Sequence, residues 1–147
     1  MPLSFSSFFT FLAVMIFPTA ACGAHLYPES HYVRQWCGEH GGEVEVILPD
    51  KTRCDCVTAT HAVEIDFAAK WYEAVGQSLY YGLQTGKKAG IVLIIETESD
   101  RKYWLRLNST ILHYDLPIDT WLTGEEEAPA VRPPMSAIRQ LLLKNRE

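Results

Sequence analysis

Three acidic residues and one lysine stand close together near the middle of the chain. Asp55, Glu64 and Asp66 fall in two short segments that are rich in strand-forming residues, and Lys70 follows shortly after the second segment. Paired carboxylates bind divalent cations such as Mg²⁺ through their oxygens. A lysine beside them stabilises negative charge on a phosphate or positions an attacking water molecule. These residue types in this order predict metal-dependent hydrolysis of a phosphodiester.

The spacing of the two segments brings the carboxylates together. Residues 53–58 and 61–67 are separated by only two residues, which predicts a tight antiparallel hairpin. With the turn centred on those two residues, Asp55 lies opposite Glu64. Opposed Cβ atoms are about 4.5–5.5 Å apart, so the two carboxylates are close enough to share one Mg²⁺ or Mn²⁺ ion.

A purely structural interpretation of the same residues stays open. The hairpin register places Arg53 opposite Asp66. Arg53 then neutralises an exposed acidic face, and Asp66 pairs with Arg53 or caps the helix that follows. In this interpretation Lys70 is an ordinary surface residue.

The elements that position these residues are predicted from hydrophobic periodicity. We expect, in chain order, a helix over 28–39, strands over 43–48, 53–58 and 61–67, a helix over 68–83, a strand over 91–95, a helix over 100–114 and an edge strand over 117–122. The apolar run over 91–95 is typical of a central parallel strand, reached by a right-handed crossover. The predicted fold class is α/β, a single domain whose helix-strand-strand-strand-helix-strand core has a mixed sheet flanked by helices, plus a C-terminal helix and edge strand.

The order of these elements and a set of polar residues together form a pattern. The residues are Arg53-Cys54-Asp55-Cys56, Glu64-Ile65-Asp66, Lys70 and Gln77-x-x-x-Tyr81. This pattern resembles the PD-(D/E)xK nuclease superfamily, and its last element is similar to that of the RecB-like and Holliday-junction-resolvase-like branches. The resemblance covers roughly Glu29 to Glu96 and implies a restriction-endonuclease-like fold.

The resemblance also implies roles for individual residues. It implies metal ligands at Asp55, Glu64, Asp66 and Glu29, a catalytic lysine at Lys70, and substrate-orienting residues at Gln77 and Tyr81. The chain departs from the superfamily pattern at two points, because no proline precedes Asp55 and Asp66 stands where the pattern places its lysine.

Two further basic residues follow the predicted central strand. Arg101 and Lys102 are expected at the same sheet edge as Lys70, because parallel strands end at a common edge. There they would contact the phosphate backbone of a nucleic acid.

Composition limits the chain to one domain and disfavours some classes of protein. The chain has 147 residues, of which 48% are hydrophobic and 21% charged, with a formal net charge of −5. This length and composition suit a single core. The acidic balance argues against a protein that coats nucleic acid or anionic lipid.

The two ends of the chain are not predicted to belong to the folded domain. Residues 1–24 combine an apolar run with a small-residue stretch, which predicts a secretory signal and a periplasmic or secreted protein. The small residues before Cys22 also resemble a bacterial lipoprotein box, so lipid attachment at Cys22 is a second interpretation. Residues 124–147 are predicted to be an acidic, proline-containing linker with a short C-terminal helix.

The remaining cysteines allow a disulfide in an oxidising compartment. Cys37 on the first predicted helix can pair with Cys54 or with Cys56. Because Cys54 and Cys56 are two residues apart on one predicted strand, we expect both to point to the apolar face.

Two functional hypotheses follow. The first is an exported, Mg²⁺- or Mn²⁺-dependent nuclease that hydrolyses phosphodiester bonds. The alternative is a non-catalytic periplasmic or surface protein that keeps a nuclease-like fold for binding or structure.

Overall fold

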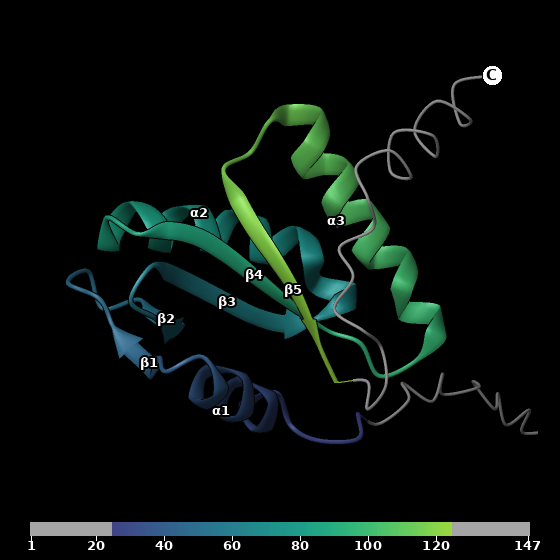
Figure 1. Ribbon diagram of the computed structural model, residues 1–147, viewed down its shortest axis with the longest axis horizontal. Helices are drawn as coiled ribbons and strands as arrows, with labels where there is room; N and C mark the ends of the chain where they lie inside the picture. Colours follow the sequence, from purple (N-terminus) through teal and green to yellow (C-terminus); the bar gives the residue numbers. More distant parts are fainter. Residues whose placement is uncertain (1–24, 125–147) are drawn as a thin grey trace, which may run out of the picture.

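Five strands form one mixed sheet that is covered by helices on both faces (Figure 1). The computed structural model describes residues 25–124. The elements are α1 (Glu29–Glu39), β1 (Glu43–Ile47), β2 (Arg53–Val57), β3 (His61–Phe67), α2 (Trp71–Thr85), β4 (Lys88–Ile94), α3 (Arg101–Tyr114) and β5 (Ile118–Thr123), with short 3₁₀ turns η1 (Ala68–Lys70) and η2 (Glu98–Asp100). Three predictions lie outside the described residues: the signal segment, lipid attachment at Cys22, and the linker with a short helix within 125–147.

The predicted fold class and order of elements are confirmed. The strands lie in the order β1-β2-β3-β4-β5. Neighbouring strands are antiparallel from β1 to β3 and parallel from β3 to β5. Within residues 25–124, no helix is long and apolar enough to cross a membrane.

Local sequence explains where the helices that flank the site begin and end. Pro28 precedes α1 with φ −65° and Glu29 occupies its first turn, a position where the helix dipole favours a negative charge. Helix α2 ends at Thr85 and is capped by Gly86, which has φ 65°. Glycine adopts this left-handed conformation without the steric cost that other residues incur.

The two faces of the sheet pack against different helices. On one face, Tyr32, Val33 and Trp36 of α1 pack against residues of β3 and β4 that include Val63 and Val92. On the other face, α2 and α3 pack over Ile91, Leu93 and their neighbours. Figure 1 shows the same arrangement, with α1 on one side of the sheet and the other two helices on the opposite side.

A disulfide ties α1 to the sheet. Cys37 is bonded to Cys56 of β2, whereas Cys54 is a free, buried thiol. Cys54 packs with Ala62 and Tyr81, on the side of α2. The expectation that Cys54 and Cys56 share one face is therefore wrong. Between these cysteines the ladder with β1 is interrupted where Glu45 adopts φ 54°, so the strand does not keep its simple two-residue alternation.

Gly42 gives the disulfide its space. A Cβ atom on Gly42 would lie 2.5 Å from Cys56 Sγ and 2.7 Å from Cys37 Sγ, whereas a Cβ on Gly38 would have no atom within 4 Å. We expect Gly42→Ala to lower the free energy of unfolding by about 1–3 kcal/mol through overpacking. The matched control Gly38→Ala, in α1, should leave stability unchanged or raise it by up to about 1 kcal/mol. Urea denaturation of both variants checks this, and equal effects would contradict it.

Candidate active site

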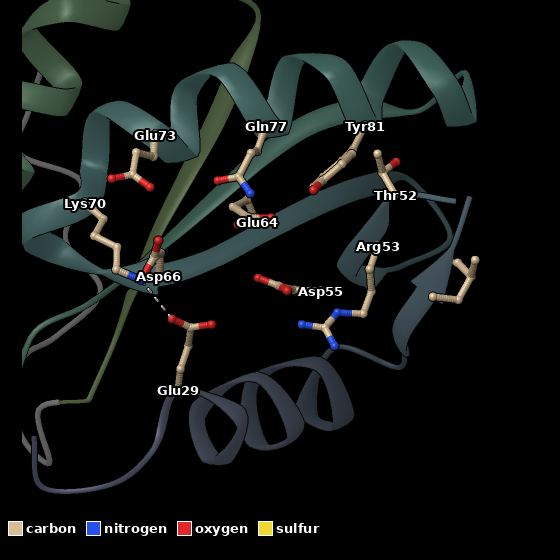
Figure 2. A pocket seen from close by; sticks show the side chains of 11 residues that line it. Glu29, Thr52, Arg53, Asp55, Glu64, Asp66, Lys70, Glu73, Gln77 and Tyr81 are labelled. Carbon is tan, nitrogen blue, oxygen red and sulfur yellow. Dashed lines mark ion pairs between the residues drawn. The ribbon is translucent and has the colours of Figure 1, made fainter. Parts of the chain in front are cut away.

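One cavity brings together most of the polar residues that the sequence singles out. Its volume is about 620 Å³. It is lined by Glu29 of α1, by Ile47, Thr52, Arg53 and Asp55 from β1, β2 and the turn between them, by Glu64 and Asp66 of β3, by Lys70, and by Glu73, Gln77 and Tyr81 of α2. Figure 2 shows these side chains converging from the two helices and the strands between them.

The cavity exists because β2 and β3 pair only near their turn. The ladder pairs Cys56 with Val63 and Val57 with Ala62, which is the predicted register. Beyond these pairs, the backbone N–H of Ile65 donates to Asp55 Oδ2 at 2.9 Å. A side chain thus takes the place of a backbone acceptor, and the Asp55 carboxylate points into the cavity below Glu64 (Figure 2).

Glu64 is one of two buried acidic residues of the cavity, with Asp66. It is 6% exposed, and its Oε2 is buried without a hydrogen-bond partner. Burial, followed by the charges of Asp55 and Asp66, raises the pKa of Glu64 to about 9. A buried carboxylate without a partner is costly, and a cation at Oε2 would remove that cost.

The other acidic residue of β3, Asp66, forms an ion pair with Lys70. Lys70 Nζ lies 3.0 Å from Asp66 Oδ1 and 3.5 Å from Glu29 Oε2, and the hydrogen bond to Asp66 raises the pKa of Lys70. Burial and the neighbouring Asp66 raise the pKa of Glu29 to about 7. Lys70 therefore stays protonated at neutral pH and joins the first helix to the end of β3.

Arg53 does not pair with Asp66, contrary to the prediction. Its Nη1 lies 3.7 Å from Glu45 Oε1 in an exposed pair. The pairing of β2 with β3 stops at Cys56, so the strands diverge before Arg53 comes opposite Asp66. Burial raises the pKa of Asp55 to about 6. The hydrogen bond from the backbone N–H of Ile65 and the charge of Arg53 act in the opposite direction.

Helix α2 supplies one wall of the cavity. Glu73, Gln77 and Tyr81 recur every four residues and so share one helix face; all three line the cavity. Gln77 and Tyr81 were predicted here. Glu73 was not predicted as a site residue, although it stands four residues before Gln77 and therefore lies on the same helix face. Thr52 and Ile47 also line the cavity, and no pattern in the sequence marks them.

Arg101 and Lys102 do not line the cavity. Arg101 Nε lies 2.7 Å from Glu98 Oε2, and Lys102 Nζ lies 4.8 Å from the centroid of the Tyr103 ring. The turn η2, which Thr97 and Asp100 close by reciprocal capping, sets the start of α3 and places Arg101 beside Glu98.

The donor set of the cavity fits a hard divalent cation. No three Asp, Glu, His or Cys side chains between residues 25 and 124 are grouped as a ready-made ion site. Glu64, whose Oε2 is buried without a hydrogen-bond partner, nevertheless lines the same cavity as Asp55, and carboxylate oxygens are the ligands that Mg²⁺ and Mn²⁺ prefer. Asp55 and Glu64 would hold such an ion, with Asp66 beside them.

Comparisons with known proteins were made at three levels. A scan against protein-family models, a search of curated proteins and a search of solved structures each found no match. The resemblance to PD-(D/E)xK nucleases therefore stays a prediction carried by the order of elements and by the residues of the cavity.

Proposed function

We propose that this protein is a metal-dependent nuclease that hydrolyses phosphodiester bonds with Mg²⁺ or Mn²⁺. The observation that carries the proposal is the convergence of Asp55, Glu64, Asp66 and Lys70 on one cavity in which Glu64 Oε2 is buried and unpartnered. Structural carboxylates are normally satisfied by nearby donors. A carboxylate that is buried without one is expected where an ion or substrate supplies the missing partner.

Each residue of the cavity has a distinct role in this proposal. Asp55 and Glu64 would hold the cation, which would supply Lewis-acid polarisation of the phosphate and a lowered pKa of a bound water molecule. The bond from Ile65 to Asp55 fixes the orientation of that carboxylate. Lys70 is already protonated, so its positive charge stabilises the negative charge that develops on the phosphate. It does not accept the proton of the attacking water.

The remaining residues position the lysine and the substrate. Asp66 and Glu29 hold Lys70 from two elements, which limits its movement at the cavity wall. Gln77 and Tyr81 present amide and hydroxyl groups on the opposite wall and orient the substrate.

The proposal includes export of the protein. Disulfides persist in oxidising compartments and are rare in the cytosol. The Cys37–Cys56 disulfide therefore supports the periplasmic or secreted location that the first 24 residues predict.

The test is a cleavage assay with the purified protein on single- and double-stranded DNA and RNA, in Mg²⁺, in Mn²⁺ and in EDTA. We expect cleavage that requires the metal and that is lost in Asp55→Asn. Absence of cleavage from folded protein under all conditions would reject the nuclease and leave the alternative, a binding protein with a nuclease-like fold. The ion pairs of Lys70 with Asp66 and Glu29 favour that alternative, because they neutralise part of the cavity without a metal.

Lys70→Ala should lower kcat by about 10²–10³-fold, because it removes one preorganised positive charge from the transition state. The free energy of unfolding should fall by about 1–3 kcal/mol, since the side chain of Asp66, which loses its partner, is only 7% exposed. Lys88→Ala is the matched control, because Lys88 is exposed and outside the cavity. Steady-state kinetics of both variants checks this. An unchanged kcat in Lys70→Ala would remove the lysine from the mechanism.

A further inference from the structure

The charge balance of the cavity restricts what it can bind. Among its lining residues are five carboxylates, on Glu29, Asp55, Glu64, Asp66 and Glu73, and two cations, on Lys70 and Arg53. Lys70 is held by Asp66 and Glu29. Arg53 is therefore the lining cation with the most freedom to bind a substrate.

The ion pair that Arg53 forms in the folded protein is weak. Its contact with Glu45 is 3.7 Å long, and the two side chains are 58% and 50% exposed. Exposed pairs of this kind contribute about 0–1 kcal/mol, so an incoming anion can replace Glu45 at little cost. The guanidinium presents its donors in a planar fork that matches two phosphate oxygens.

Arg53 is also placed next to the proposed ion site. It lies two residues before Asp55 on β2, and its charge influences the pKa of that carboxyl group. Figure 2 shows the guanidinium beside the Asp55 carboxylate, on the side of α1. A phosphate on Arg53 would therefore be a neighbour of a phosphate on the ion.

The same end of the cavity offers an apolar surface. Ile47 is the cross-strand partner of Arg53, lines the cavity and is 61% exposed. A nucleobase attached to the bound phosphate could pack against this side chain and remove it from water. Phosphate and base contacts thus lie side by side at Arg53 and Ile47.

We propose that the cavity binds a single nucleic-acid strand in preference to a duplex, and that Arg53 binds the phosphate adjacent to the cleaved one. This inference rests on the proposed function and adds the substrate class. A duplex-binding protein that contacts about 6–10 phosphates needs many cationic groups, whereas this cavity offers Arg53, Lys70 and a metal ion beside five acidic side chains. Its volume of about 620 Å³ is that of a small-ligand pocket and accommodates one or two nucleotides of an unpaired strand.

The test measures binding separately from cleavage. Fluorescence anisotropy gives the Kd of the purified protein for a labelled single strand and for the same sequence as a duplex, in Ca²⁺ and over a series of salt concentrations. We expect the single strand to bind at least about tenfold more tightly than the duplex. The slope of log K against log salt should be about −0.7 to −1.4, which corresponds to one or two phosphates on a single strand.

Substitutions at Arg53 test its role. Arg53→Gln should weaken single-strand binding about tenfold and reduce the salt slope by about 0.7, the loss of one phosphate contact. Arg53→Lys should restore the slope and only part of the affinity, because it keeps the charge without the planar fork. Arg34→Gln is the matched control. Arg34 is exposed on α1 and outside the cavity, so this variant should change neither quantity.

The outcomes separate this inference from the proposed function. Equal or tighter duplex binding with a steep salt slope, or an unchanged slope in Arg53→Gln, overturns the inference even if the protein cleaves DNA or RNA. Single-strand binding that depends on Arg53 without any cleavage rejects the nuclease and supports the preference for a single strand and the role of Arg53 in binding phosphate. Failure to bind or to cleave either form overturns both.

Discussion

Glu64→Gln is expected to abolish metal-dependent cleavage and, at the same time, to make the metal-free protein more stable. Glu64 is buried with one oxygen unpartnered, and in our proposal it is a ligand of the cation. Glutamine has nearly the same shape and no charge, so it removes the ligand with little change in packing. Activity should fall by about 10³-fold or more, the scale associated with loss of the main electrostatic contribution to catalysis.

The expected gain in stability follows from the pKa of Glu64. Its value in the folded protein, about 9, lies above the ordinary 4.5, so the folded state binds the proton more tightly than the unfolded state. The contribution of this group to stability is complete below about pH 4.5 and is lost as pH rises toward 9. Asp55 and Glu29, with pKa values raised to about 6 and about 7, act in the same direction.

The measurement is thermal and urea unfolding in EDTA and in Mg²⁺ or Mn²⁺, from acidic to mildly alkaline pH. In EDTA, wild-type stability should fall with rising pH, and Glu64→Gln should be more stable than wild type at about pH 8 by about 1–3 kcal/mol. Added metal should stabilise wild type and not the variant. Glu39→Gln, at the exposed end of α1, should behave as wild type. A variant that is less stable than wild type at alkaline pH would contradict the assignment of Glu64.

Loss of the Cys37–Cys56 disulfide is expected to cost about 3 kcal/mol of stability. The bond closes a loop with a sequence separation of 19 residues, and constraining a loop of that length in the unfolded chain stabilises the folded state by about this amount. Both cysteines are fully buried, so the double variant Cys37→Ala/Cys56→Ala also loses packing. Its unfolding midpoint should therefore lie below that of reduced wild type.

The control uses the third cysteine of the described region. Cys54→Ala removes a buried thiol that forms no disulfide, so it should lose stability through packing alone. A reducing agent should then destabilise wild type and Cys54→Ala equally and leave Cys37→Ala/Cys56→Ala unaffected. Urea denaturation with and without reductant measures this. Equal stability of wild type in both conditions would show that the cross-link contributes nothing.

Much of the fold was predictable because its elements are encoded by short-range patterns. The alternation over 43–48, the apolar stripe over 68–83 and the run over 91–95 correspond to β1, α2 and β4. The hairpin register, seen in the pairing of Cys56 with Val63, follows from a two-residue connection. These features depend on residues that are near neighbours in the chain, so the sequence alone is enough to predict them.

The sequence was enough to predict which residues form the candidate site. It was not enough to predict which of them contact one another. Local patterns in the chain were enough to place the polar residues on β2, β3 and α2, and hence to predict that Asp55, Glu64, Asp66 and Lys70 gather at one side of the sheet. Three features depend on the three-dimensional packing: β2 is unpaired with β3 before Cys56, Arg53 contacts Glu45 and not Asp66, and Glu29 contacts Lys70. The physical reason is that desolvation and ion pairing depend on which elements cover a group in space, and local periodicity along the chain carries no such information.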